Sequence, residues 1–173
     1  IQHAPSQPLV TIGLDGSSPW AKSGPRVSWE TPVPVIADLD PFLDRLARIP
    51  APPDAVNPWS SDTSYGQIRL HNLRRYLDQL LDRGADTLML GEAPGYLGCR
   101  RTGIGFTSEP QMLAGIPQLG LFGAERGYQR SGEFTDLRRE QSATIVWGEL
   151  TRLDFVPLIW AAYPFHPHKP GQP

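Results

Sequence analysis

A short polar turn that follows a mostly apolar run is the part of the sequence best suited to chemistry. Residues 91–95 read Gly-Glu-Ala-Pro-Gly and come directly after residues 87–90, Thr-Leu-Met-Leu. The two glycines allow a tight turn and close approach of a ligand to the backbone, and the proline stiffens it. The carboxylate of Glu92 can accept hydrogen bonds or transfer a proton. The pentapeptide alone also fits an ordinary strand-to-loop turn, because it lacks the spacing of a P-loop or of a dinucleotide-binding fingerprint.

Two histidines near the end of the sequence form a second group of polar candidates. One proline separates His166 from His168, so an extended backbone places both imidazoles on one side. Such a pair could bind a metal, or donate to a phosphate or to a developing anion. A metal site needs a third ligand, and neither His3 nor His71 is evidently close, so we expect no metal and favour a phosphate-facing role. The alternative is a proline-stiffened loop with two solvated histidines.

Arginines gather in the second half of the chain, where they could neutralise phosphates. They are Arg100, Arg101, Arg126, Arg130, Arg138 and Arg139. Six acidic residues lie in the same part of the sequence, residues 84–139, so an arginine-rich surface requires the two signs to be separated in space. The net charge of −2 gives no overall attraction to nucleic acid or to acidic membranes, and any such contact must be local.

Hydrophobic spacing indicates the elements that would position these residues. It predicts a helix from Asp40 to residue 49, a second helix over residues 65–82 and a third over residues 142–153, begun by Ser142 as its N-cap. Apolar runs at 87–90 and 155–159 are of strand length. In the second helix, Arg69 is expected away from the apolar face, which comprises Leu70, Leu73, Leu77, Leu80 and Leu81.

The order of these elements predicts an α/β fold. Two strands joined through a helix form a parallel pair with a right-handed crossover. Because a parallel sheet normally has four or more strands, we expect a domain that lacks its C-terminal part. Residues 91–132 form a Gly-rich connection with little periodicity, and loops of that length are usually functional or disordered. Residues 1–37 contain six prolines and predict an extended or disordered arm.

Length and composition set further bounds. The 173 residues fit one ordinary domain, and no apolar run approaches the ~18 residues that cross a bilayer, so we expect no membrane partner. Cys99 is the one cysteine, which excludes an internal disulfide and suits a reducing cytoplasm. It is expected to be an inert, buried thiol, and Trp147 and Trp160 are expected to belong to the core.

The turn and its continuation together resemble the uracil-DNA glycosylase superfamily. Residues 96–109, Tyr-Leu-Gly-Cys-Arg-Arg-Thr-Gly-Ile-Gly-Phe-Thr-Ser-Glu, place Phe106 about ten residues after the turn in a Gly-rich context. The resemblance is closest to the branch whose first motif reads Gly-Glu-Ala-Pro-Gly, and a polar segment after an apolar strand, as in residues 155–168, supports it. It implies a three-layer sandwich with a central parallel sheet over residues 38–173, incomplete at its C-terminal part.

The resemblance also implies a function and a site. The family flips a damaged base, here expected to be uracil, out of DNA and hydrolyses its N-glycosidic bond. Glu92 and the backbone of Ala93 would then act beside the sugar and the attacking water. The base would lie against Gly91, Pro94, Gly95, Tyr96, Phe106 and Ala161. DNA phosphates would meet Arg100, Arg101, His166 and His168. The expected partner is DNA, single-stranded or duplex with a flipped base, bound by a monomer that needs no cofactor.

The sequence departs from the family pattern at several points. Members of this branch commonly carry four cysteines for an iron–sulfur cluster, and a single cysteine predicts none. Ala161 stands where an Asn usually reads the uracil edge, and alanine offers no donor or acceptor. Gly105 stands where a Pro often precedes the stacking Phe. The family's last motif, which holds a base-contacting His near the C-terminal strand, is expected to lie beyond residue 173.

Two alternatives therefore remain beside the repair enzyme. The chain could be a catalytically weakened or inactive DNA-binding member of the same fold, because of Ala161. Outside that superfamily, it could be a small-molecule-binding α/β domain that uses the turn at residues 91–95.

Overall fold

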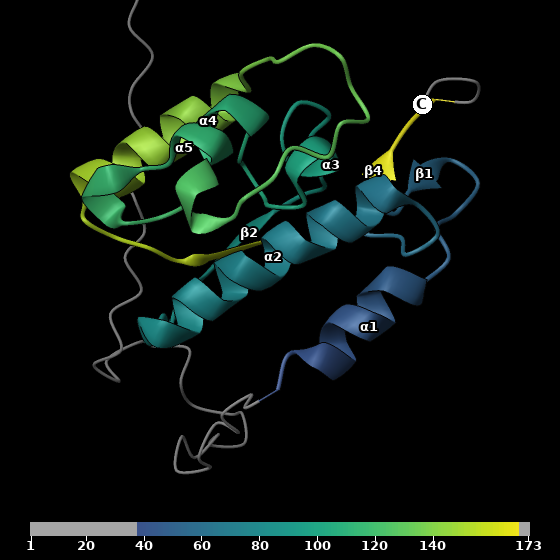
Figure 1. Cartoon of the computed structure of the whole chain (residues 1–173), viewed down its shortest axis with the longest axis horizontal. Helices are drawn as coiled ribbons and strands as arrows, with labels where there is room; N and C mark the ends of the chain where they lie inside the picture. Colours follow the sequence, from purple (N-terminus) through teal and green to yellow (C-terminus); the bar gives the residue numbers. More distant parts are fainter. Residues whose placement is uncertain (1–37, 170–173) are drawn as a thin grey trace, which may run out of the picture. The chain divides into compact units, whose positions relative to one another are not determined.

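The computed structural model describes residues 38–169, which form a mixed α/β arrangement with two small sheets (Figure 1). The arm expected at residues 1–37 lies outside the described residues. Strands β1 (Ala55–Val56) and β4 (His166–Pro167) pair antiparallel. Strands β2 (Leu88–Gly91) and β3 (Leu158–Ala161) pair in parallel, as predicted. No helix in the described part of the chain is both long enough and apolar enough to cross a membrane.

The parallel pair sets the geometry of the fold. Its register joins Leu88 to Leu158 and Gly91 to Ala161, so the polar segments after both strands leave the same edge. The first strand was predicted one residue too early, at residues 87–90. The second strand was predicted at residues 155–159, but it spans Leu158–Ala161. The second strand starts at Leu158 because the preceding residues still complete the end of a helix, where the N–H of Phe155 donates to the carbonyl of Leu150 (3.0 Å).

The first two helices agree with the hydrophobic spacing. Helix α1 (Asp40–Arg48) buries Leu43 and Leu46, and Asp40 lies in its first turn rather than at the N-cap, which is Leu39. Helix α2 (Ser64–Asp82) has Thr63 as its N-cap, and the Thr63 hydroxyl accepts a hydrogen bond from the N–H of Gly66 (3.0 Å). These two helices form the lower part of the fold in Figure 1.

Helix α2 also covers the outer edge of β3. The hydroxyl of Tyr76 donates to the carbonyl of Pro157 (2.8 Å) and accepts from the N–H of Ile159 (3.2 Å). Tyr76 is fully buried, so this one side chain satisfies two backbone groups at a strand edge that water does not reach.

The long Gly-rich connection contains several short helices instead of being wholly irregular. They are α3 (Cys99–Thr102), α4 (Glu109–Ala114), η1 (Pro117–Leu119) and η2 (Ala124–Arg126). Helix α5 (Gln141–Arg152) follows, and its N-cap is Glu140 rather than the predicted Ser142. Elements of one turn have too few residues to show a helical period, which is why the sequence did not indicate them.

A cluster of buried ion pairs holds this connection to α2. Arg69 and Arg100 are buried and share the carboxylate of Glu133, which Arg100 binds through both terminal nitrogens (2.7 and 2.8 Å). Burial alone would raise the pKa of Glu133, but hydrogen bonds from Arg100 and Arg69 lower it to about 2. The expectation that Arg69 lies away from the buried face of α2 is wrong, because its side chain is buried. Leu81 was expected on that face, but it is 49 % exposed.

Arg101 belongs to the same buried layer. It pairs with Asp136 (2.9 Å) and lies 3.7 Å from the fully buried Glu109. Its guanidinium also stacks 4.2 Å from the ring centre of Phe134. Arg100 and Arg101 therefore serve the fold, which corrects the interpretation that they face DNA phosphates.

Replacing Glu133 tests this cluster. Glu133→Gln leaves two buried guanidinium groups without their carboxylate, so the free energy of unfolding should fall by about 2–3 kcal/mol. Urea unfolding measures the change, with Glu125→Gln as the control, because Glu125 is 70 % exposed and its loss should cost under ~0.5 kcal/mol. Equal stability of the two variants would contradict the structural role of the cluster.

Candidate functional site

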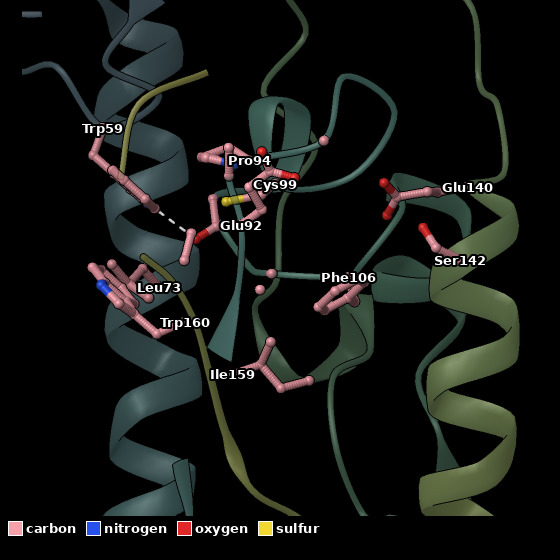
Figure 2. A pocket seen from close by; sticks show the side chains of 16 residues that line it. Trp59, Leu73, Glu92, Pro94, Cys99, Phe106, Glu140, Ser142, Ile159 and Trp160 are labelled. Atoms are coloured by element: carbon pink, nitrogen blue, oxygen red, sulfur yellow. Dashed lines mark hydrogen bonds between the residues drawn. The ribbon is translucent and has the colours of Figure 1, made fainter. Parts of the chain in front are cut away.

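A pocket of about 350 Å³ opens where β2 and β3 end (Figure 2). The turn after β2 forms one side of it, and the ring of Phe106 and the end of β3 form others. The lining residues are Trp59, Leu73, Gly91, Glu92, Ala93, Pro94, Gly95, Cys99, Gly103, Gly105, Phe106, Glu140, Ser142, Ile159, Trp160 and Ala161. The carboxyl edge of a parallel pair is where ligands bind in open α/β sheets.

The ring of Phe106 lies directly against the backbone of Gly91. A Cβ atom added to Gly91 would lie 3.1 and 3.2 Å from two carbons of that ring, closer than ordinary van der Waals contact. A larger residue at position 91 would therefore push the ring away from the turn. Gly91 is needed for this close approach, and its φ angle is not in the left-handed region.

A clamp of hydrogen bonds holds the backbone of Phe106 in place. Its φ is +46°, a left-handed conformation that costs a bulky L-residue on the order of 1–2 kcal/mol. The hydroxyl of Thr102 donates to the carbonyl of Thr107 (2.8 Å), and the indole N–H of Trp147 donates to the hydroxyl of Thr107 (3.1 Å). Thr107, the residue that follows Phe106, is thus fixed by Thr102 of α3 and Trp147 of α5.

The residue before Phe106 is confined by β3. A Cβ atom on Gly105 would lie 2.7 Å from a methyl carbon of Ile159, so a proline there would require that side chain to move. The glycine that departs from the family pattern is consistent with the packing of this chain.

The turn itself is fixed by the segment that follows β3. The N–H groups of Ala162 and Tyr163 donate to the carbonyls of Gly91 (2.8 Å) and Glu92 (2.9 Å). The carbonyl of Pro94 lies 2.7 Å from Nδ1 of His166, which donates when it carries the proton. The segment after β3 therefore holds the turn after β2 in place through these hydrogen bonds.

His166 is a structural histidine rather than an exposed one. Its side chain is buried, and burial lowers the pKa of the imidazole below its ordinary value. It does not line the pocket, which corrects the expectation that it faces phosphates. His168 is half-buried beside it, and its backbone N–H donates to the carbonyl of Asp54 (2.9 Å).

Most of the residues expected to hold the base do line the pocket. They are Gly91, Pro94, Gly95, Phe106 and Ala161, together with Glu92 and Ala93. Tyr96 is the exception, since its ring packs edge-on against Phe134 and beneath the guanidinium of Arg101. Glu92 is exposed, and Ala161 is half-buried where it lines the pocket.

Two tryptophans form an apolar wall that the sequence did not indicate as part of a site. Trp160 was expected in the core, but it lines the pocket and stacks on Trp59 with ring centres 5.5 Å apart and planes 10° apart. The indole N–H of Trp59 donates to the carbonyl of Gly103 (3.0 Å), the contact drawn as a dashed line in Figure 2. Trp59 lies in a Pro-rich loop, and only tertiary structure brings it to the strand end.

Glu140 and Ser142 are the polar pocket residues that the sequence analysis missed. Both come from the start of α5, and Figure 2 shows them on the side of the pocket opposite Trp59 and Trp160. The signal in the sequence was a carboxylate at the beginning of a predicted helix, which is common and points to no particular site.

No group of three or more His, Cys, Asp or Glu residues that could hold a metal occurs among residues 38–169. Cys99 is buried against the pocket, and burial raises the pKa of its thiol well above the ordinary value. A single thiol of this kind does not fit an iron–sulfur cluster, which requires several thiolates.

Comparisons with protein-family models, with curated proteins and with solved structures found no match for this chain.

The burial of His166 leads to a prediction about pH. Because the folded state lowers the pKa of His166, the unfolded state binds the proton more tightly, and the free energy of unfolding should fall as pH drops below about 6.5. His166→Asn keeps a donor near the position of Nδ1 but cannot titrate, so this part of the pH dependence should disappear.

Urea unfolding at pH 7.5 and pH 5 checks the effect by comparing the two proteins. The carboxyl groups titrate in both proteins, so their contributions to the pH dependence cancel in the difference. An identical pH dependence in the variant would show that His166 is not held neutral by the fold.

Proposed function

We propose that the chain is a DNA glycosylase that binds a flipped base, uracil in the first instance, and hydrolyses its bond to the sugar. The observation that supports this most directly is that the ring of Phe106 and the turn at residues 91–95 are walls of one pocket. The resemblance of residues 91–109 to the uracil-DNA glycosylase superfamily gives the reaction class.

The pocket suits a planar heterocycle. Its volume of about 350 Å³ falls at the lower end of the range for small-ligand sites. One face of the base would stack on Phe106, which contributes ~1–3 kcal/mol for a base on an aromatic ring. The remaining walls are mainly backbone and apolar side chains, so a flipped base would leave most of its water behind.

The reaction requires a water, a stabilised sugar cation and an anionic leaving base. The bond from C1′ to the base nitrogen breaks with its electron pair passing to the base, and water adds to C1′ and loses a proton. Glu92 stands at the rim, where the sugar would lie, and its carboxylate can orient this water and stabilise positive charge at C1′.

Because Arg100 and Arg101 are buried, other basic residues would contact the DNA. Arg138 and Arg139 are exposed in the loop just before Glu140, on the α5 side of the pocket. His168 and Lys169 lie on the segment after β3. We propose that these residues meet the phosphates on either side of a flipped nucleotide, bound by a monomer in the cytoplasm.

A larger sheet belongs to the same proposal. Leu88 and Leu90 are each 57 % exposed on one face of β2, although parallel sheets are normally covered on both faces. Such a face supports a three-layer sandwich of the uracil-DNA glycosylase type, in which further elements cover it.

A non-catalytic DNA-binding protein is the second candidate, and Ala161 favours it. Ala161 lines the pocket, in register with Gly91, at the position where the family places an amide that reads the base. A pocket that holds a base without reading its edge would bind DNA and turn over slowly.

A uracil-excision assay on single-stranded DNA tests the proposal, with Phe106→Ala as the key variant. Strand breaks after alkali identify an enzyme, and the variant should lose about tenfold or more in rate because the stacking surface is gone. Phe155→Ala is the control, since Phe155 is 39 % exposed and lies outside the pocket.

A thermal melt of Phe106→Ala distinguishes a ligand-binding ring from a core ring. A large loss of stability that accounts for the lost activity would assign Phe106 to the core. A salt-sensitive DNA shift without strand breaks identifies the binding protein, and no DNA affinity at low salt leaves a small-molecule site.

Restoring an amide at the end of β3 tests the alignment of that strand. Ala161→Asn adds one donor group and one acceptor to the pocket, so uracil excision should rise by about tenfold. The rate is measured beside Ala162→Asn, whose side chain lies outside the pocket and should have no effect. An unchanged rate in Ala161→Asn would reject the assignment of Ala161 to the base-reading position.

A further inference from the structure

Glu140 places a carboxyl group inside the pocket from the side opposite the tryptophans (Figure 2). A Cβ atom added to Gly95 would lie 2.3 Å from its Oε1, and one added to Gly98 would lie 2.1 Å from its Oε2. The carboxyl thus rests on the backbone of the turn and of the residues that follow it. Its place is next to the turn against which the ring of Phe106 is packed.

The fold makes little use of this carboxyl. Glu140 is the N-cap residue of α5, but its side chain makes no capping hydrogen bond. Its Oε2 atom is buried and has no hydrogen-bond partner. No ion pair to Glu140 occurs among residues 38–169. A buried polar atom without a partner costs free energy, so a functional reason for keeping it is expected.

The surroundings favour the neutral form of the carboxyl. Burial raises the pKa of Glu140, and the Ser142 hydroxyl offsets this in part. The other titratable groups that line the pocket are Glu92 and Cys99, and neither supplies a positive charge. A neutral carboxyl group donates one hydrogen bond through its O–H and accepts another through its carbonyl oxygen.

We propose, on the basis of the proposed function, that Glu140 reads the polar edge of the base as a neutral carboxylic acid. Its donor and acceptor would match a base edge with an acceptor next to a donor, such as O4 and N3–H of uracil. It would supply the hydrogen-bond pair that Ala161 cannot offer, but from the α5 side. Glu140 is then a specificity-determining residue of the pocket, while Glu92 at the rim serves the sugar.

The alternative uses of the polar groups fit less well. Glu92 is exposed, so it cannot replace the hydrogen bonds that a buried base edge loses from water. The Cys99 thiol is a weak donor with a raised pKa. Glu140 is the pocket side chain that combines a buried, unpartnered oxygen with both a donor and an acceptor.

Titration of the full chain with free uracil by calorimetry tests the inference. Glu140→Ala should weaken uracil binding by about tenfold, the usual effect of losing hydrogen bonds to a ligand. Glu140→Gln should stay within about twofold, because an amide also has a donor and an acceptor. Glu149→Gln on the exposed side of α5 is the matched control and should bind like the unaltered chain.

Stability separates a ligand-reading role from a structural one. Because the carboxyl has an unpartnered buried oxygen, the thermal midpoint of Glu140→Ala should equal or exceed that of the unaltered chain. Weaker binding together with a lower midpoint would overturn the inference. Equal loss of binding in Glu140→Gln and Glu140→Ala would also overturn it, since it would show that an ionised carboxylate is what the ligand uses.

The outcomes also separate this inference from the function on which it rests. Uracil binding that Glu140→Ala leaves unchanged would overturn the role of Glu140 while the glycosylase proposal stands. Absence of uracil binding and of excision in the unaltered chain would overturn both.

Discussion

The candidate site depends on the contact between the ring of Phe106 and the bare backbone of Gly91. A side chain at position 91 would enter the space of the ring, so the end of β2 and the Phe-bearing loop can meet only because this residue is glycine. In this arrangement the loop adopts a left-handed backbone at Phe106, which costs free energy. Hydrogen bonds from Thr102 and Trp147 hold that conformation, so the pocket wall is set before any ligand arrives.

The buried arginines explain how a Gly-rich connection can carry such a wall. Arg69 on α2 and Arg100 on α3 share Glu133, and Arg101 binds Asp136, so two distant parts of the loop are tied to one another and to a long helix. Breaking such pairs is costly because each leaves a buried charge without a partner. These ion pairs lend rigidity to the loop, and in the proposed DNA complex we assign the phosphate contacts to the exposed Arg138 and Arg139 instead.

The sequence predicted the parts of the fold that rest on local patterns. Helix α2 follows from the spacing of leucines and the strand before the turn from a short apolar run. The resemblance of residues 91–109 led us to expect Phe106 beside the turn, and its ring lines the same pocket as the turn. The burial of Arg69 could not be predicted, because its carboxylate partner lies 64 residues away in the chain. The same reason applies to Trp59 and Glu140, which reach the pocket only through the packing of loops and of α5. Local pattern indicates which element a residue occupies, whereas the partner of a buried charge is a tertiary property.

The central claim is that a base stacks on the ring of Phe106 beside the turn at residues 91–95. NMR titration of the chain, with its phenylalanine rings labelled with ¹³C, tests this directly with free uracil as the ligand. The account predicts upfield shifts of the uracil H5 and H6 protons, and nuclear Overhauser effects between these protons and the Phe106 ring. Uracil that binds with no change at Phe106, or with contacts to another aromatic ring instead, would contradict it.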